Sequence, residues 1–209
     1  MALRILPFRQ YDENDVVNLF ALVGEGNTQT TDSGDGDAGV FVQVASGNFG
    51  ADPISYATNS YLGKTDYPFV GRNQYPGVPL RCKPATQYNS VLGVTLLQTA
   101  QQDENGEKLL YNPQKREELQ CVLPGQAVPI LTKGIITLTA DALSQGWTHT
   151  IGTGVKVGGD AGKLTGCIPY SDVEKIGIVI GTGDRTAQTE SDQFAGTGTE
   201  KYLVVALGL

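Results

Sequence analysis

The sequence contains a single histidine, His149, in a chain of 209 residues. Any Ser-His-Asp or Cys-His mechanism would have to use that one side chain. The chain also has no Gly-x-Ser-x-Gly turn to hold a nucleophile. We therefore interpret His149 as a structural residue and predict that the protein is not an enzyme. A pair of carboxylates acting as in a glycosidase is the enzymatic alternative that stays open, because no sequence spacing excludes it.

Cysteine is scarce as well. The three cysteines, Cys82, Cys121 and Cys167, are isolated and form no C-x-x-C pair. With one histidine they do not complete a zinc site of the usual spacing. An odd number of cysteines fits reduced, buried thiols of a protein assembled inside a cell. We expect no metal and no cofactor.

Long apolar runs and clustered basic residues are also missing. No run approaches the ~20 apolar residues of a membrane helix, and the apolar stretch before Pro7 is too short for a signal peptide. The formal net charge is −7, and Lys115-Arg116 is the only adjacent basic pair. Phosphate backbones are bound by clustered Lys and Arg. We therefore expect a soluble protein, made in a cytoplasm, whose partners include neither nucleic acid nor membrane.

What the chain has in abundance is turn residues. Glycine occurs 27 times and proline 10 times, without a collagen-like period, and 40% of the residues are hydrophobic. Many turns between short apolar runs favour an all-β sandwich or small β-barrel. The expected strands cover residues 16–23, 40–44, 91–97, 121–123, 127–131, 134–139, 155–157, 163–165, 176–180 and 202–207. Short helical turns are expected after Asp12, after Asn112, which would cap a helix starting at Pro113, and within residues 139–146.

Two of the expected strands are apolar without interruption. Ile178-Val179-Ile180 and Leu203-Val204-Val205 predict strands that are buried on both faces. In a small barrel only one face of a strand meets the core. The other face should therefore meet a partner subunit or another segment of the chain.

We divide the chain into an N-terminal arm (residues 1–35), an irregular Tyr/Pro-rich interaction region (residues 36–90) and a β-barrel domain (residues 91–209). Aromatic residues alternate with prolines in residues 54–88, and proline interrupts helices and central strands. Such a segment needs apolar surface to lie on, which we expect a neighbouring subunit to provide; folding back on its own barrel is the alternative. The residues expected to contact a neighbouring subunit are Phe8, Tyr11, Phe20, Tyr61, Tyr67 and Tyr75.

Two motifs resemble known ligand-binding motifs in part of their sequence. The acidic loop from Asp32 to Asp37 lacks the register and the final Glu of an EF-hand, so we interpret it as a solvated loop tip. Gly-Thr-Gly occurs at 152–154, 181–183 and 196–198, but none of these opens a G-x-G-x-x-G or phosphate-binding loop. We interpret these glycines as turn residues.

The second half of the chain resembles a known family. Lys133-Gly134-Ile135-Ile136-Thr137-Leu138 is followed by Gly152-Thr153-Gly154-Val155-Lys156-Val157, then Gly162-Lys163-Leu164-Thr165, then Lys175-Ile176-Gly177-Ile178-Val179-Ile180-Gly181 and a last apolar strand. This order resembles the small β-barrel capsid decoration, or cement, proteins of tailed bacteriophages. Residues 6–22 are also similar to virion structural proteins of marine cyanophages.

The resemblance implies a homotrimer that binds the major capsid protein on the outer surface of a virion and stabilises the shell. The family has no catalytic residues to carry over. The alternatives are another virion component, such as a tail or vertex protein, and a secreted carbohydrate-binding β domain that uses surface tyrosines.

Overall fold

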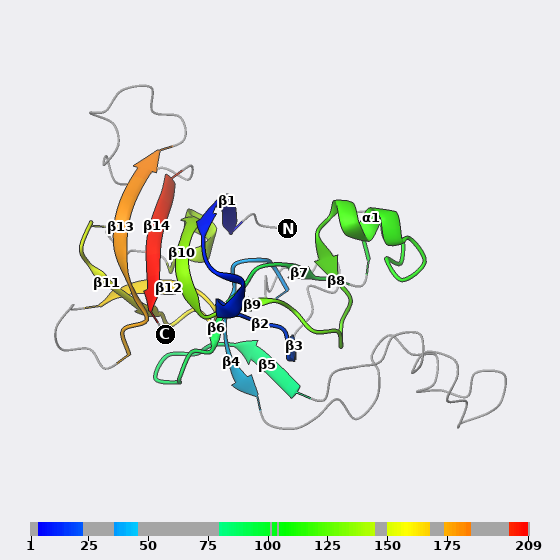
Figure 1. Cartoon of the computed structure of the whole chain (residues 1–209), viewed down its shortest axis with the longest axis horizontal. Helices are drawn as coiled ribbons and strands as arrows, with labels where there is room; N and C mark the ends of the chain where they lie inside the picture. The colour runs from blue at the N-terminus through cyan, green and yellow to red at the C-terminus, as the bar shows by residue number, and fades with distance from the viewer. Residues whose placement is uncertain are drawn as a thin grey trace.

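The computed structural model describes residues 4–22, 36–45, 80–100, 102–103, 105–144, 150–167, 174–184 and 201–208. In these residues strands dominate, and the helical structure consists of one short α-helix, α1 (Pro113–Glu118), and the 3-10 turns Glu13–Asp15 and Ala140–Ala142. The prediction of an all-β fold is confirmed. The strands form two six-stranded sheets and a small two-stranded one (Figure 1).

The first sheet has the strand order β1-β10-β14-β13-β11-β12, and all its neighbours are antiparallel. Its strands are β1 (Ile5–Gln10), β10 (Lys133–Thr139), β14 (Lys201–Gly208), β13 (Gly177–Asp184), β11 (Gly154–Val157) and β12 (Leu164–Cys167). The long strands β10, β14 and β13 lie side by side and form its centre (Figure 1).

The second sheet has the order β2-β9-β6-β4-β5-β3. Its strands are β2 (Val16–Val17), β9 (Ile130–Leu131), β6 (Gly93–Thr95), β4 (Phe41–Ala45), β5 (Leu80–Pro84) and β3 (Phe20–Leu22). Only β3 and β5 run parallel. The strands β7 (Gln98–Thr99) and β8 (Cys121–Val122) pair beside α1.

The main core lies between the two large sheets. Its buried residues alternate along β10 and β14, where Ile136 and Leu138 face the same side as Leu203 and Val205. The second sheet contributes Phe41, Val94 and Leu131 to the same cluster. This arrangement is a two-layer sandwich, as expected for sheets that bury one face against each other.

The second sheet is buried on its other face too. Val40, Val42 and Ile130 alternate with the residues of the main core and pack with Leu22 and Val128 in a separate cluster. The first sheet has no such second cluster among the described residues. In the described part of the chain the two sheets therefore differ, since one has a buried apolar cluster on both faces and the other on one face only.

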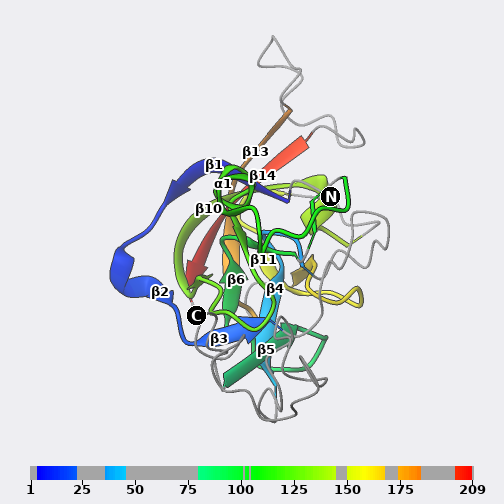
Figure 2. The ribbon, with the colours of Figure 1, turned by 90° about the vertical axis from the view of Figure 1, so that its right-hand side faces the viewer.

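Two expectations about the architecture are corrected. The described strands form open sheets, with β1 and β12 at the ends of one and β2 and β3 at the ends of the other, rather than a closed barrel. Residues 4–22 are also not a separate arm: β1 pairs with β10, β2 with β9 and β3 with β5. The reason is burial, because Ile5, Ala21 and Leu22 complete the two cores. Figure 2 shows β1 to β3 passing along one side of the molecule from the first sheet to the second.

The boundaries expected at residues 35 and 90 do not separate domains either. Strands β4 and β5, from the expected irregular region, are the neighbours of β6 and β3 in the second sheet. The described residues therefore share one fold. Residues 46–79, which hold most of the Tyr/Pro-rich stretch, lie outside the described residues.

Several local predictions are confirmed. The Asn112 side chain accepts a hydrogen bond from the Lys115 amide, with Pro113 at the first helical position of α1. Asp12 caps the turn Glu13–Asp15 in the same way through the Asn14 amide. Gly162, at a positive φ of 71°, turns the hairpin between β11 and β12.

Candidate interaction surface

We call the side of β10, β14 and β13 that faces away from the main core the outward face of the first sheet. The register places Ile178 beside Ala206, Gly181 beside Val204 and Gly183 beside Tyr202. On the other side of β14, Ala206, Val204 and Tyr202 pair with Ile135, Thr137 and Thr139 of β10. These positions alternate with the core residues, so one contiguous face collects apolar side chains and threonines.

Adjacent residues of β13 show how different the two sides are. Val179 is 1% exposed in the core, whereas Ile178 is 38% exposed and Ile180 is 44% exposed. A bulge contributes to this, because Val179 pairs with Val205 and Gly181 with Val204, which leaves Ile180 without an opposite residue. The prediction that both faces of these strands are buried is therefore wrong for the isolated chain. The apolar run does have a second face, on which Ile178 and Ile180 are exposed.

The outward face carries almost no charge. Among its described positions on β10, β14 and β13, the one charged residue is Lys133, at the end of β10. The character of the sheet changes at β11, where Lys156 Nζ lies 3.7 Å from a carboxylate oxygen of Glu174. The uncharged area therefore has a definite border on that side, as is typical of a surface that another protein covers.

A groove opens where β1 separates from β10. Ile5 pairs with Leu138 and Arg9 with Ile136, so the residues between Ile5 and Arg9 bulge away from β10. The groove has a volume of about 640 Å³ and contains no charged side chain. Its walls are Leu6, Pro7, Phe8, Thr137, Tyr202 and Val204.

Glycine shapes the wall of this groove formed by β14. Gly183 faces Tyr202 across the pair of β13 and β14. A Cβ atom at position 183 would meet the far end of the Tyr202 ring, so this part of the ring lies over the glycine. An aromatic ring over a cross-strand glycine restores contact that the glycine itself lacks. Gly181-Thr182-Gly183 is thus part of a strand rather than of a turn.

The aromatic residues expected to contact a neighbour lie in different environments. Phe8 is 85% exposed on the wall of the groove, and Tyr11 follows β1 and is partly exposed beside Gly134. Phe20 is partly buried against the second cluster of its own chain, and its assignment to a partner contact stays a prediction. Tyr61, Tyr67 and Tyr75 lie outside the described residues. Ile180 and Val204 belong to the two uninterrupted apolar runs, and Tyr202 to the last expected strand, but none of the three was among the residues expected to contact a neighbour.

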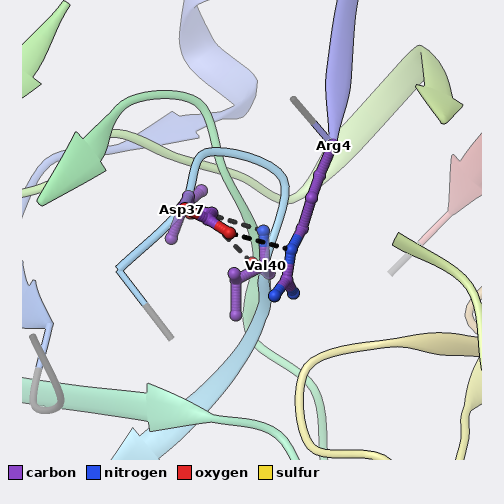
Figure 3. Close-up of polar contacts among 4 residues, drawn as sticks. Arg4, Asp37 and Val40 are labelled. Carbon is purple, nitrogen blue, oxygen red and sulfur yellow. Dashed lines mark hydrogen bonds and ion pairs between the residues drawn. The ribbon is translucent and has the colours of Figure 1, made fainter. Parts of the chain in front are cut away.

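A buried ion pair joins the two sheets at the other end of β1. Arg4 Nε lies 3.3 Å from a carboxylate oxygen of Asp37, and both residues are buried. Figure 3 shows the Arg4 side chain extending from the start of β1 to the loop before β4, which carries Asp37. We expected Asp37 to lie in a solvated loop tip, and its burial shows that this prediction is wrong. Asp32 lies outside the described residues.

The cysteines are free and buried, as predicted. Burial raises the pKa of the Cys82 thiol to about 12 and that of Cys121 to about 11. At neutral pH both therefore remain protonated and unreactive, since the thiolate is the nucleophile and metal ligand. His149 lies outside the described residues.

The described residues offer little for chemistry. They contain no group of three or more His, Cys, Asp or Glu side chains that could hold a metal ion. In the same part of the chain, no helix is long and apolar enough to cross a membrane. The expectations of no metal, no cofactor and no catalytic role stay predictions.

Comparisons with known proteins give no family. No family model, no curated protein and no solved structure matches the chain. The outward face and the resemblance in the strand and turn pattern are therefore the features that bear on function.

Proposed function

We propose that this chain is a structural virion protein without catalytic activity, which binds the outer surface of a tailed-bacteriophage capsid as a homotrimer and stabilises the shell. The observation that supports this most is the outward face of the first sheet. An uncharged sheet face flanked by exposed Ile178 and Ile180 is costly to leave in water. Covering it with protein removes that cost.

The partners are the major capsid protein and further copies of the chain. A two-layer sandwich is rigid, so it can hold such a face in a fixed orientation without ordering a flexible segment on binding. Many copies on one shell add avidity, because each bound subunit keeps its neighbours at high local concentration. Contacts across the boundaries between capsomers would then resist the pressure of packaged DNA.

Binding to capsids tests the proposal. Capsids from a phage that lacks this protein are mixed with the purified chain, and occupancy and the temperature of shell disruption are measured. We expect saturable binding and a higher disruption temperature. The variant Ile178→Lys/Ile180→Lys should bind weakly, because it places two charges in the apolar face.

Leu19→Lys is the matched control. Leu19 is also well exposed, but it lies in the connection between β2 and β3, two strands of the second sheet. Its variant should bind as the unchanged chain does. Failure of the unchanged chain to bind capsids, or full binding by the double variant, would contradict the proposal.

A further inference from the structure

We propose that Phe8 of one copy of the chain packs into the groove on the outward face of a second copy. This inference rests on the proposed function, since it names the contact through which copies associate. The groove is the one lined by Leu6, Pro7, Phe8, Thr137, Tyr202 and Val204.

Phe8 has the properties of an anchoring residue. It is 85% exposed, the most exposed of the large apolar side chains among the described residues. It lies on β1, the edge strand, in the segment that bulges away from β10. Pro7 directly before it has a fixed φ angle, which limits the freedom of the bulge. A preorganised aromatic ring loses little entropy on binding and buries a large area.

The groove has the properties of the matching site. It is apolar, and its floor residue, Thr137, is 4% exposed. Tyr202 closes one side, with the far end of its ring over Gly183. At about 640 Å³ the groove has room for an aromatic side chain. Aromatic rings in fixed apolar pockets dominate the free energy of many protein interfaces.

A second copy is suited as the occupant because it presents an exposed Phe8 that matches the apolar groove. The chain carries a formal net charge of −7, so most orientations of two copies bring like charges together. The groove and Phe8 are both uncharged, so contact between them avoids this repulsion. Every copy also carries both halves of the contact. The contact therefore closes either about a twofold axis, with each ring in the other groove, or about a threefold axis, with each ring in the groove of the next copy.

Cross-linking between singly substituted chains tests the contact directly. One preparation carries Phe8→Cys and a second carries Val204→Cys, and a short bifunctional thiol reagent is added to their mixture. The native cysteines are buried, so the new thiols react first. We expect a mixed Phe8→Cys/Val204→Cys product from the mixture. Tyr88→Cys mixed with Val204→Cys is the control, because Tyr88 lies in the turn after β5, and it should give no product.

Sedimentation of unlinked chains provides a second measurement. Phe8→Ala should raise the dissociation constant of the assembly roughly 10-fold or more, while Tyr88→Ala should leave it unchanged. A chain that is monomeric at tens of micromolar, or a Phe8→Ala variant that assembles normally, overturns the inference.

The outcomes for assembly and for capsid binding can be told apart. If Phe8→Ala assembles normally and binds capsids, the inference fails and the proposed function stands. If Phe8 reaches the groove but capsids are not bound, the inference stands and the capsid role fails. A dimeric mass with the cross-link present supports the contact and overturns the homotrimer.

Discussion

The carbonyl oxygen of Leu131 occupies the space that a Cβ atom would need at Gly93 on the neighbouring strand. The two residues belong to β9 and β6, which pair in the second sheet. Ile130 Cγ2 crowds the same position. Because the obstruction includes backbone, no rotation of a side chain can relieve it. Position 93 therefore has no room for a side chain larger than that of glycine.

Gly93→Ala is expected to destabilise the protein by about 1–3 kcal/mol, the usual cost of forcing extra volume into a packed core. The measurement is the free energy of unfolding in urea. Gly159→Ala is the control, because nothing lies within 4 Å of a Cβ atom there; its effect should stay within about 0.5 kcal/mol. Equal stabilities of the two variants would contradict the packing described for Gly93.

The ion pair between Arg4 and Asp37 leads to a second prediction. Arg4→Ala removes the guanidinium beside a buried carboxylate, and breaking a buried pair on one side typically costs about 3–5 kcal/mol. The double change Arg4→Met/Asp37→Asn removes both charges and should recover part of that loss. Lys156→Ala breaks the more exposed pair with Glu174 and should cost about 0–1 kcal/mol. Urea unfolding of the three variants gives the comparison, and a larger loss for Lys156→Ala would contradict it.

The buried thiols predict how stability depends on pH. The pKa of Cys82 is raised from 9.0 to about 12 and that of Cys121 from 9.0 to about 11, in both cases mainly by burial. Below pH 9 the native and unfolded chains both hold these protons. Above it the unfolded chain releases them first, so the free energy of unfolding should fall as pH rises from about 9 to 11.

Two measurements check this prediction. Urea unfolding between pH 8 and 11 should show the fall, and Cys82→Ala should show a smaller one. A thiol reagent at pH 8 should modify the three cysteines in denaturant and leave them unmodified in the native protein. Rapid modification of the native chain would contradict their burial.

Local chemistry explains why part of the fold was predictable. The caps at Asp12 and Asn112 depend on residues within a few positions of one another, and both were predicted correctly. The pairing of β1 with β10 joins residues that are far apart in the sequence. A strand of two or three residues, such as β2 or β3, has too little pattern of its own to specify its partner.

The interaction surface was predictable only in part, for a related reason. The apolar run around Val179 correctly indicated a strand with two apolar faces. It did not show that Ile180 is a bulge residue, because register depends on pairing with β14. Phe8 and Phe20 look alike in sequence, yet one lies beside the groove and the other packs on its own core. Composition identified the aromatic residues, and only the arrangement of the strands distinguished their environments.

Two adjacent residues of β14 give the last prediction, because they point to opposite sides of the first sheet. Leu203 is 1% exposed in the main core, and Leu203→Ala should destabilise the isolated chain by about 2–5 kcal/mol. Val204 lies on the outward face and lines the groove. Val204→Lys should therefore change the stability of the monomer by no more than about 1 kcal/mol, since a partly exposed strand position tolerates such a change.

The two variants should affect association in the opposite way, with Val204→Lys the more harmful of the two. Val204→Lys brings a charge into the groove, so sedimentation should show weaker assembly and a larger share of monomer. Urea unfolding at a concentration low enough to keep the chain monomeric separates this effect from stability, because assembly stabilises any chain that can form it. Leu203→Ala should still assemble at temperatures where it is folded. If Val204→Lys unfolds the monomer as severely as Leu203→Ala does, the outward face is part of the chain's own core and not a surface for a partner.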